Sequence, residues 1–161
     1  MNPLHNLPPE RGQQYFVDPV PLNRALGLRY VSSGIGHIVY DLPWQAELVG
    51  DPETGILQGG AITVMFDAAC GGAIVSKLDE VCRLVTLDLR IDYLRPATPH
   101  KTVRCEAECH RVTKHIAWAR ATAYHDDISL PIATAIGSFM LMRDDPGSHI
   151  LAAVDVAGRV T

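Results

Sequence analysis

One segment limits what this chain can fold into more than any other. Residues 59–75 read GGAITVMFDAACGGAIV, which is apolar on nearly every side when it is drawn as a helix. A helix without a polar face must be buried on most sides, so the rest of the chain has to surround it. We therefore expect a helix over about Gly59–Lys77 at the centre of the domain.

The segments around this helix alternate between apolar and other residues with a period of two, which is typical of strands. In the clearest of them, 85–93, one face is predicted to carry Val85, Leu87, Leu89, Ile91 and Tyr93, and the other Thr86, Asp88, Arg90 and Asp92. Further strands are expected over 26–33, 37–42, 102–112, 115–125 and 131–142.

This order of two strands, one helix and four strands predicts an α+β fold in which an antiparallel sheet wraps around the helix. The expected domain covers 26–143, with a lead-in over 1–25 and a tail over 144–161. A single helix covers only one face of the sheet, so an edge or face remains to be protected, and self-association is a common solution.

Composition excludes some classes of partner. The chain has 161 residues and a formal net charge of −4, which argues against a nucleic-acid-binding surface. No segment reaches the run of about 18 apolar residues typical of a membrane span. The N-terminus lacks the features of a secretory signal. We therefore expect a cytoplasmic protein with no nucleic-acid and no membrane partner.

The cysteines and histidines give no support for a disulfide or a metal site. No CxxC pair and no HExxH motif occurs. Cys105 and Cys109 are expected on one strand, about 13 Å apart, which is too far for a disulfide. Reduced thiols and no metal or cofactor are the prediction.

Asp67 is the one ionisable residue inside the apolar segment. A buried carboxylate costs several kcal/mol unless it is paired, hydrogen-bonded or protonated. One turn earlier, Thr63 could donate at most one hydrogen bond to it. An aspartate on a helix is usually just exposed to solvent, but these apolar surroundings favour a residue that faces a polar crevice or takes part in chemistry.

The start of the helix carries the second signal, the sequence Gln58-Gly59-Gly60. The first turn of a helix has free N–H groups and the positive end of the helix dipole, which suit a carbonyl oxygen that gains negative charge. Asp67 follows Gly59 by about 12 Å along the helix. If both act at one site, they must come from two antiparallel helices in a dimer.

The combination of Leu57-Gln58-Gly59-Gly60, Asp67 and the sequence Asp-Tyr-Leu-Arg-Pro-Ala over 92–97 resembles the PaaI-type thioesterases of the hotdog superfamily. The resemblance covers about 26–143. It implies the hotdog fold, hydrolysis of an acyl- or aryl-coenzyme A thioester, and a homodimer or dimer of dimers with its active site at the subunit interface. Coenzyme A enters as part of the substrate, so no cofactor is implied.

The resemblance also implies roles for single residues. The Gly59 N–H matches the group that polarises the thioester carbonyl, Asp67 the nucleophile or general base, and Thr86 the hydroxyl that places the attacking water. Gln58 stands where the family has a histidine, and it can hydrogen-bond the carbonyl or hold the loop. Pro52 stands near the position of the family's loop asparagine, which is therefore unmatched.

Substrate contacts are expected from the helix and from basic residues. The acyl or aryl group would lie against Gly60, Val64, Ala68 and Gly71, together with the partner's strand over 85–94. The candidates for binding the phosphates of coenzyme A are Arg90, Arg95, Lys114 and Arg143.

Two other functions stay open. A non-catalytic acyl-coenzyme A-binding hotdog protein would keep the pocket without needing Asp67. A hotdog dehydratase or hydratase would need a catalytic histidine beside the helix, and Gln58 occupies the obvious position for it.

Overall fold

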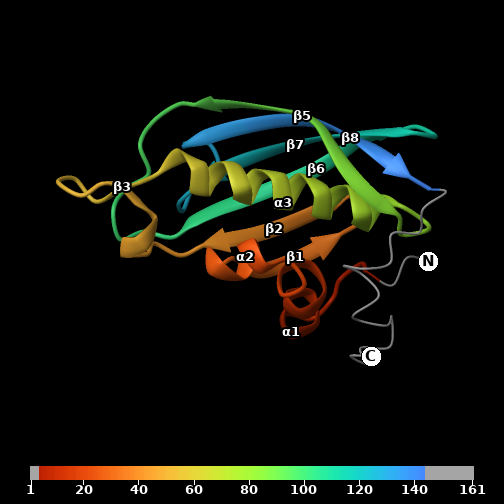
Figure 1. The fold of residues 1–161 in the computed structure, drawn as a ribbon, viewed down its shortest axis with the longest axis horizontal. Coiled ribbons are helices and arrows are strands. Elements are labelled where there is room, and N and C mark those ends of the chain that lie inside the picture. The colour runs from red at the N-terminus through yellow and green to blue at the C-terminus, as the bar shows by residue number, and fades with distance from the viewer. Residues whose placement is uncertain (1–3, 144–161) are drawn as a thin grey trace.

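The computed structural model describes residues 4–143 as one antiparallel sheet curved around a single long helix. The helix α3 spans Gly59–Lys77. Figure 1 shows α3 lying along the sheet, which bends around it from β1 at one edge to β5 at the other. This arrangement confirms the predicted α+β hotdog architecture, with the apolar helix at its centre.

The sheet has the strand order β1-β2-β6-β7-β8-β5, and every neighbouring pair is antiparallel. Its strands are β1 (Arg29–Gly34), β2 (His37–Leu42), β5 (Arg83–Tyr93), β6 (Val103–Val112), β7 (Ile116–Tyr124) and β8 (Ala133–Met142). The edges are therefore β1 and β5, and β5 is the longer of the two with 11 residues.

The remaining elements are short. The lead-in forms α1 (Pro9–Gly12), a π-helical turn (Gln13–Val17) and α2 (Pro21–Ala25), and its Val17 is part of the hydrophobic core. Within the expected loop 43–58, the chain forms a 3-10 turn (Ala46–Leu48) and a separate two-stranded sheet of β3 (Val49–Asp51) and β4 (Ile56–Leu57). The predicted tail 144–161 lies outside the described residues.

The core lies between α3 and the inner face of the sheet. Met65, Phe66 and Ala69 of the helix are completely buried, and α3 packs mainly on β2, β6 and β7. Small side chains on β7 let the helix pack closely against the sheet. They form a stripe of buried alanines: Ala117, Ala119, Ala121 and Ala123. The helix has the length and hydropathy of a membrane span, but 61% of that window is buried inside the fold, as in the core helix of a domain.

The strict alternation predicted for 85–93 is wrong at one point. The pairing of β5 with β8 shifts between Thr86 and Asp88, so Leu87 is an extra residue in a β-bulge. A shift of one residue reverses which face a side chain points to. Thr86, paired with the buried Phe139, therefore faces the helix, and Val85, paired with the exposed Met140, faces outward.

The bulge explains a glycine on the neighbouring strand. A Cβ atom on Gly137 would lie 2.9 Å from the backbone oxygen of Asp88, closer than side chains tolerate. Gly137 therefore lets β8 stay close to the bulged part of β5.

Candidate active site

One face of α3 is left uncovered by the sheet. Its residues follow helical spacing and are all exposed or half-buried: Gly60, Thr63, Val64, Asp67, Ala68 and Gly71. The predicted acyl-contact residues thus share one face with Asp67. Apart from Asp67, this face carries only small, apolar or hydroxyl side chains, so it offers an apolar surface with one carboxylate at its middle.

Asp67 is exposed on this face, and within residues 4–143 its carboxylate has one hydrogen-bond donor. Thr86 donates a hydrogen bond from Oγ1 to Asp67 Oδ1 over 2.8 Å. Thr63, the possible donor one turn earlier, donates instead to the Gly59 carbonyl oxygen 3.2 Å away. A carboxylate held by one hydroxyl and otherwise open can accept a proton from water or attack an electrophile.

The first two N–H groups of α3, those of Gly59 and Gly60, differ in their hydrogen bonding. Gln58 is the N-cap residue, and its Oε1 accepts a hydrogen bond of 3.0 Å from the Gly59 N–H. The Gln58 N–H donates to the Leu48 carbonyl oxygen over 2.8 Å, which holds the cap against the loop before β3. Within residues 4–143, the Gly60 N–H has no hydrogen-bond acceptor. The amide expected to be free, Gly59, is therefore covered by Gln58 in this chain.

Tyr93, at the end of β5, lies against the same turn. Its hydroxyl donates to the Gly59 carbonyl oxygen over 2.7 Å. A Cβ atom on Gly59 would lie 3.1 Å from the phenol oxygen, so the absence of a side chain at Gly59 lets the ring sit there. The sequence pattern places Tyr93 on the apolar face of its strand and in the 92–97 motif, but its contact with the helix start depends on the curvature of the sheet.

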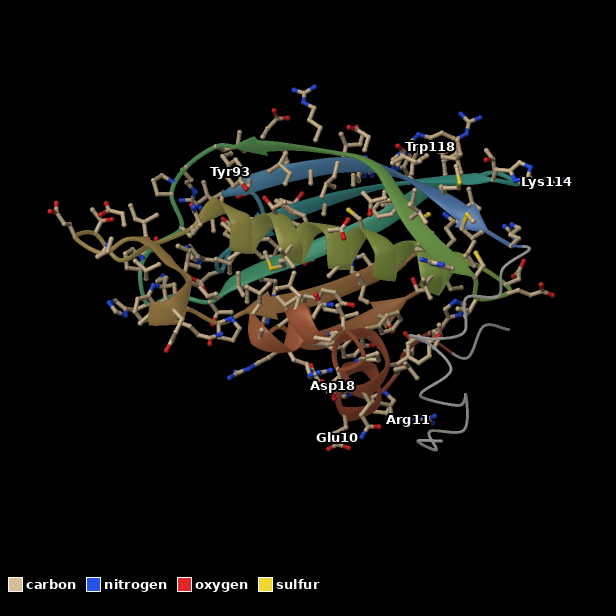
Figure 2. All side chains as sticks on the ribbon, viewed as in Figure 1. Glu10, Arg11, Asp18, Tyr93, Lys114 and Trp118 are labelled. Carbon is tan, nitrogen blue, oxygen red and sulfur yellow. The ribbon has the colours of Figure 1, made fainter. Side chains whose placement is uncertain are left out.

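The four candidate cations do not gather at one place. Arg90 pairs with Asp92 at 3.1 Å, and Arg95 donates to the backbone oxygens of Leu130 and Pro131. Arg143 donates from Nε to the Lys114 backbone oxygen over 3.0 Å. Figure 2 shows Lys114 at the end of the molecule opposite to Tyr93.

The thiols are poor nucleophiles. All four cysteines are buried and free, and Cys105 and Cys109 both lie on β6. Cys70 lies one turn from Asp67 on the buried side of α3. Burial, with a smaller contribution from the Asp67 charge, raises the pKa of the Cys70 thiol to about 12. Among the described residues, no three His, Cys, Asp or Glu side chains gather in a way that could hold a metal ion.

The comparisons with known proteins agree on the family. The model of the thioesterase superfamily matches residues 54–132. The medium/long-chain acyl-CoA thioesterase YigI of Salmonella typhimurium is 30% identical over 144 residues, which cover 80% of this chain and 90% of that protein. YigI of Escherichia coli is 28% identical over 141 residues, with the same shares covered.

Solved structures share the fold. A Pseudomonas aeruginosa protein from a structural genomics programme is 40% identical, with a TM-score of 0.74 over 83% of this chain and 98% of that one. The E. coli PaaI protein from the phenylacetic acid degradation operon is 20% identical, with a TM-score of 0.68 over 76% of this chain and 85% of that one. The chain belongs to the thioesterase superfamily, has its hotdog fold and is a thioester hydrolase.

Proposed function

We propose that this protein hydrolyses medium- or long-chain acyl-coenzyme A, with Asp67 as the nucleophile or general base. The observation that carries the proposal is the Thr86–Asp67 hydrogen bond on the uncovered, largely apolar face of α3. The YigI relatives, which are named for medium- and long-chain substrates, support the acyl class. Aryl substrates have weaker support, because the likeness to PaaI at 20% identity concerns the fold alone.

A homodimer completes the site in this proposal. Strand β5 is an edge strand with exposed apolar side chains, among them Leu87, which is 48% exposed, and Tyr93, which is 51% exposed. Pairing of two β5 edges across a two-fold axis is a common way to cover such an edge and would set the two α3 helices antiparallel. The start of one helix then lies opposite the middle of the other, which brings Gly59 to Asp67 of the partner subunit. A dimer of dimers remains a further proposal.

The reaction follows from these groups. The Gln58 side chain turns away, and the thioester carbonyl oxygen accepts hydrogen bonds from the helix start, where the dipole stabilises its developing negative charge. Asp67 takes a proton from a water molecule held with Thr86, and the hydroxide adds to the carbonyl carbon. The carbon–sulfur bond then breaks, coenzyme A leaves as a thiolate, and the proton on Asp67 returns to the sulfur.

A covalent route uses the same groups. Asp67 attacks the carbonyl carbon, the thiolate leaves, and water hydrolyses the acyl-aspartyl anhydride. Neither route requires a metal ion or a cofactor. Oxygen from labelled water that enters the Asp67 carboxylate during a single turnover identifies the covalent route with attack of water on the aspartyl carbonyl, because the general-base route never transfers it there.

The phosphates of coenzyme A need cations near the site. Arg90 and Arg95 already bind groups of their own chain. Arg143 likewise donates to a backbone oxygen of its own chain, that of Lys114. Within residues 4–143 the Lys114 ammonium donates to no other group, so Lys114 is the most available of the four cations for a phosphate. All four residues remain candidates for substitution with glutamine and measurement of KM.

The deciding experiment measures thiol release from short-, medium-, long-chain and aryl acyl-coenzyme A esters. Wild type is compared with Asp67→Asn, and with Asp126→Asn as a matched control at an exposed carboxylate after β7, outside the proposed site and dimer edge. We expect turnover that peaks with medium or long chains, collapses by about 10²–10⁴-fold in Asp67→Asn and survives in the control. Binding of an ester without turnover by the wild type would instead support the non-catalytic binding protein. Addition of water to an enoyl ester without thiol release would support the hydratase.

A further inference from the structure

The Tyr93 hydroxyl joins the edge strand to the first turn of α3. It donates to the Gly59 carbonyl oxygen over 2.7 Å and lies 2.8 Å from the Thr63 hydroxyl oxygen. The Thr63 hydroxyl is in turn 3.2 Å from the same carbonyl oxygen. Two hydroxyl groups, from a strand and from the helix, thus converge on one peptide oxygen.

That oxygen belongs to the same peptide group as the Gly60 N–H. Hydrogen bonds in a chain polarise one another, so donors on the oxygen make the N–H of that peptide a stronger donor. The Gly60 N–H is also the amide of this turn that no acceptor within residues 4–143 occupies. The Gly59 N–H, by contrast, is covered by Gln58 Oε1 at 3.0 Å.

We propose that Tyr93 is a positioning residue for thioester hydrolysis. Its hydroxyl orients and polarises the Gly59–Gly60 peptide, so that the Gly60 N–H donates to the developing oxyanion together with the Gly59 N–H. Neighbouring N–H groups at a helix start converge on one anion in many proteins. This inference rests on the proposed function. It adds a second oxyanion donor, the Gly60 N–H, and the residue that orients it, Tyr93.

A purely structural role for the hydroxyl is the competing explanation. The end of β5 has other anchors, because the Leu94 and Arg95 N–H groups both donate to the Ile132 carbonyl oxygen, over 2.8 and 3.1 Å. Loss of the Tyr93 hydroxyl should therefore leave the strand in place. A phenylalanine at this position also keeps the ring that rests against Gly59.

The test compares Tyr93→Phe with Tyr124→Phe, which loses a phenol hydrogen bond to Glu106 on β6, on the face of the sheet opposite to α3. We expect the kcat of Tyr93→Phe to fall about tenfold with KM almost unchanged, since removing an oxyanion donor outright costs about 10²–10³. The Tyr124→Phe kcat should stay at the wild-type value. Thr63→Val, the second variant, should lower kcat in the same direction.

Two unreactive analogues separate positioning from structure. In the ketone a methylene replaces the thioester sulfur, and in the thioether a methylene replaces the carbonyl. Tyr93→Phe should weaken binding of the ketone and leave binding of the thioether unchanged. In NMR spectra without ligand, the Gly60 amide proton should move upfield in Tyr93→Phe but not in Tyr124→Phe.

The outcomes are distinguishable. An unchanged kcat in Tyr93→Phe, or equal weakening of ketone and thioether, overturns the positioning role while the proposed function stands. A wild-type protein that releases thiol from no ester overturns the proposed function, and the role of Tyr93 in hydrolysis with it.

Discussion

Thr86 and Asp67 lie 19 residues apart in the chain, yet the Thr86 hydroxyl donates to the Asp67 carboxylate over 2.8 Å. The contact ties the edge strand β5 to the middle of α3. It depends on the bulge at Leu87, because plain alternation from the far end of the strand would turn Thr86 to the outer face. A local irregularity of the sheet therefore decides where the hydroxyl of the site points.

Replacement of Thr86 tests this relationship. Thr86→Val keeps the shape of the side chain and removes the donor, so the Asp67 carboxylate and the attacking water lose a hydrogen-bond partner. A hydrogen bond to a charged group contributes about 1.5–3 kcal/mol, so we expect kcat to fall about tenfold or more. Thr86→Ser, which keeps the hydroxyl, should stay within a few-fold of the wild type. An equal kcat for Thr86→Val and Thr86→Ser would show that the Thr86 hydroxyl plays no part in turnover.

The sequence was sufficient to predict the elements but not the details that complete the site. The apolar helix and the period-two strands are local patterns, and both were confirmed. The bulge was missed because residues 85–93 alternate without interruption, and the extra residue shows only in the pairing with β8. The contact of Tyr93 with the helix start could not be predicted for a related reason, since the curved sheet brings Tyr93 to a helix start 34 residues earlier in the chain.

The hydrogen bonding at the start of α3 could not be predicted from the local sequence either. Free N–H groups are expected in the first turn of any helix, so the sequence predicts that the Gly59 N–H is free to bind substrate. Glutamine is not among the preferred N-cap residues, yet the Gln58 side chain accepts from that amide. The hydrogen bond from the Gln58 N–H to the Leu48 carbonyl oxygen holds the Gln58 backbone in the position from which its side chain reaches this N–H. That bond joins residues ten apart and is visible only in the structure.

The two adjacent glycines of α3 should respond differently to alanine. A Cβ atom on Gly72 would lie 2.8 Å from Ile38 Cδ1 and 3.0 Å from the Tyr40 hydroxyl, both completely buried, whereas Gly71 has no atom within 4 Å of that position. Gly71→Ala should therefore raise the free energy of unfolding by up to about 1 kcal/mol through helix propensity. Gly72→Ala should lower it, because overpacking costs about 1–3 kcal/mol.

Denaturant unfolding of both variants measures these changes in stability. A larger side chain at Gly71 also tests whether this face of α3 binds the acyl chain. Gly71→Leu should lower kcat/KM for long acyl chains more than for short ones, because it fills space on the face beside Asp67. Destabilisation by Gly71→Ala equal to that by Gly72→Ala would show that the partner subunit already fills this space. An unchanged chain-length profile in Gly71→Leu would remove Gly71 from the acyl site.

The cysteines should take no part in turnover. Burial raises the pKa of Cys70 to about 12 and holds the pKa of Cys105 well above its ordinary value, so neither forms a thiolate at mildly alkaline pH. A thiol-specific reagent should therefore leave the native enzyme active and react with all four cysteines only after unfolding. Loss of activity in step with modification of one native thiol would contradict this and point to Cys70.

The Gly59 N–H can be removed with little change to the backbone. Gln58 has φ −63° and ψ 130°, an extended conformation that suits a residue before proline, and proline is tolerated at the first position of a helix. Gly59→Pro should therefore fold and lose kcat by about 10²-fold or more, as expected for a lost oxyanion donor. Gly59→Ala is the matched control, because it adds a Cβ atom near Tyr93 but keeps the N–H.

Mixing two inactive variants tests whether one site is built from two chains. A heterodimer of Gly59→Pro and Asp67→Asn has one site with both defects and one site with neither, because the helix start comes from one subunit and the carboxylate from the other. Random mixing makes half of the dimers heterodimers, so activity should recover to about a quarter of the wild-type value per chain. If Gly59 and Asp67 of a single chain formed the site, every site in the mixture would carry one defect and no activity would return. Unfolding and refolding the two variants together, and separately as a control, followed by thiol-release assays, distinguishes these results.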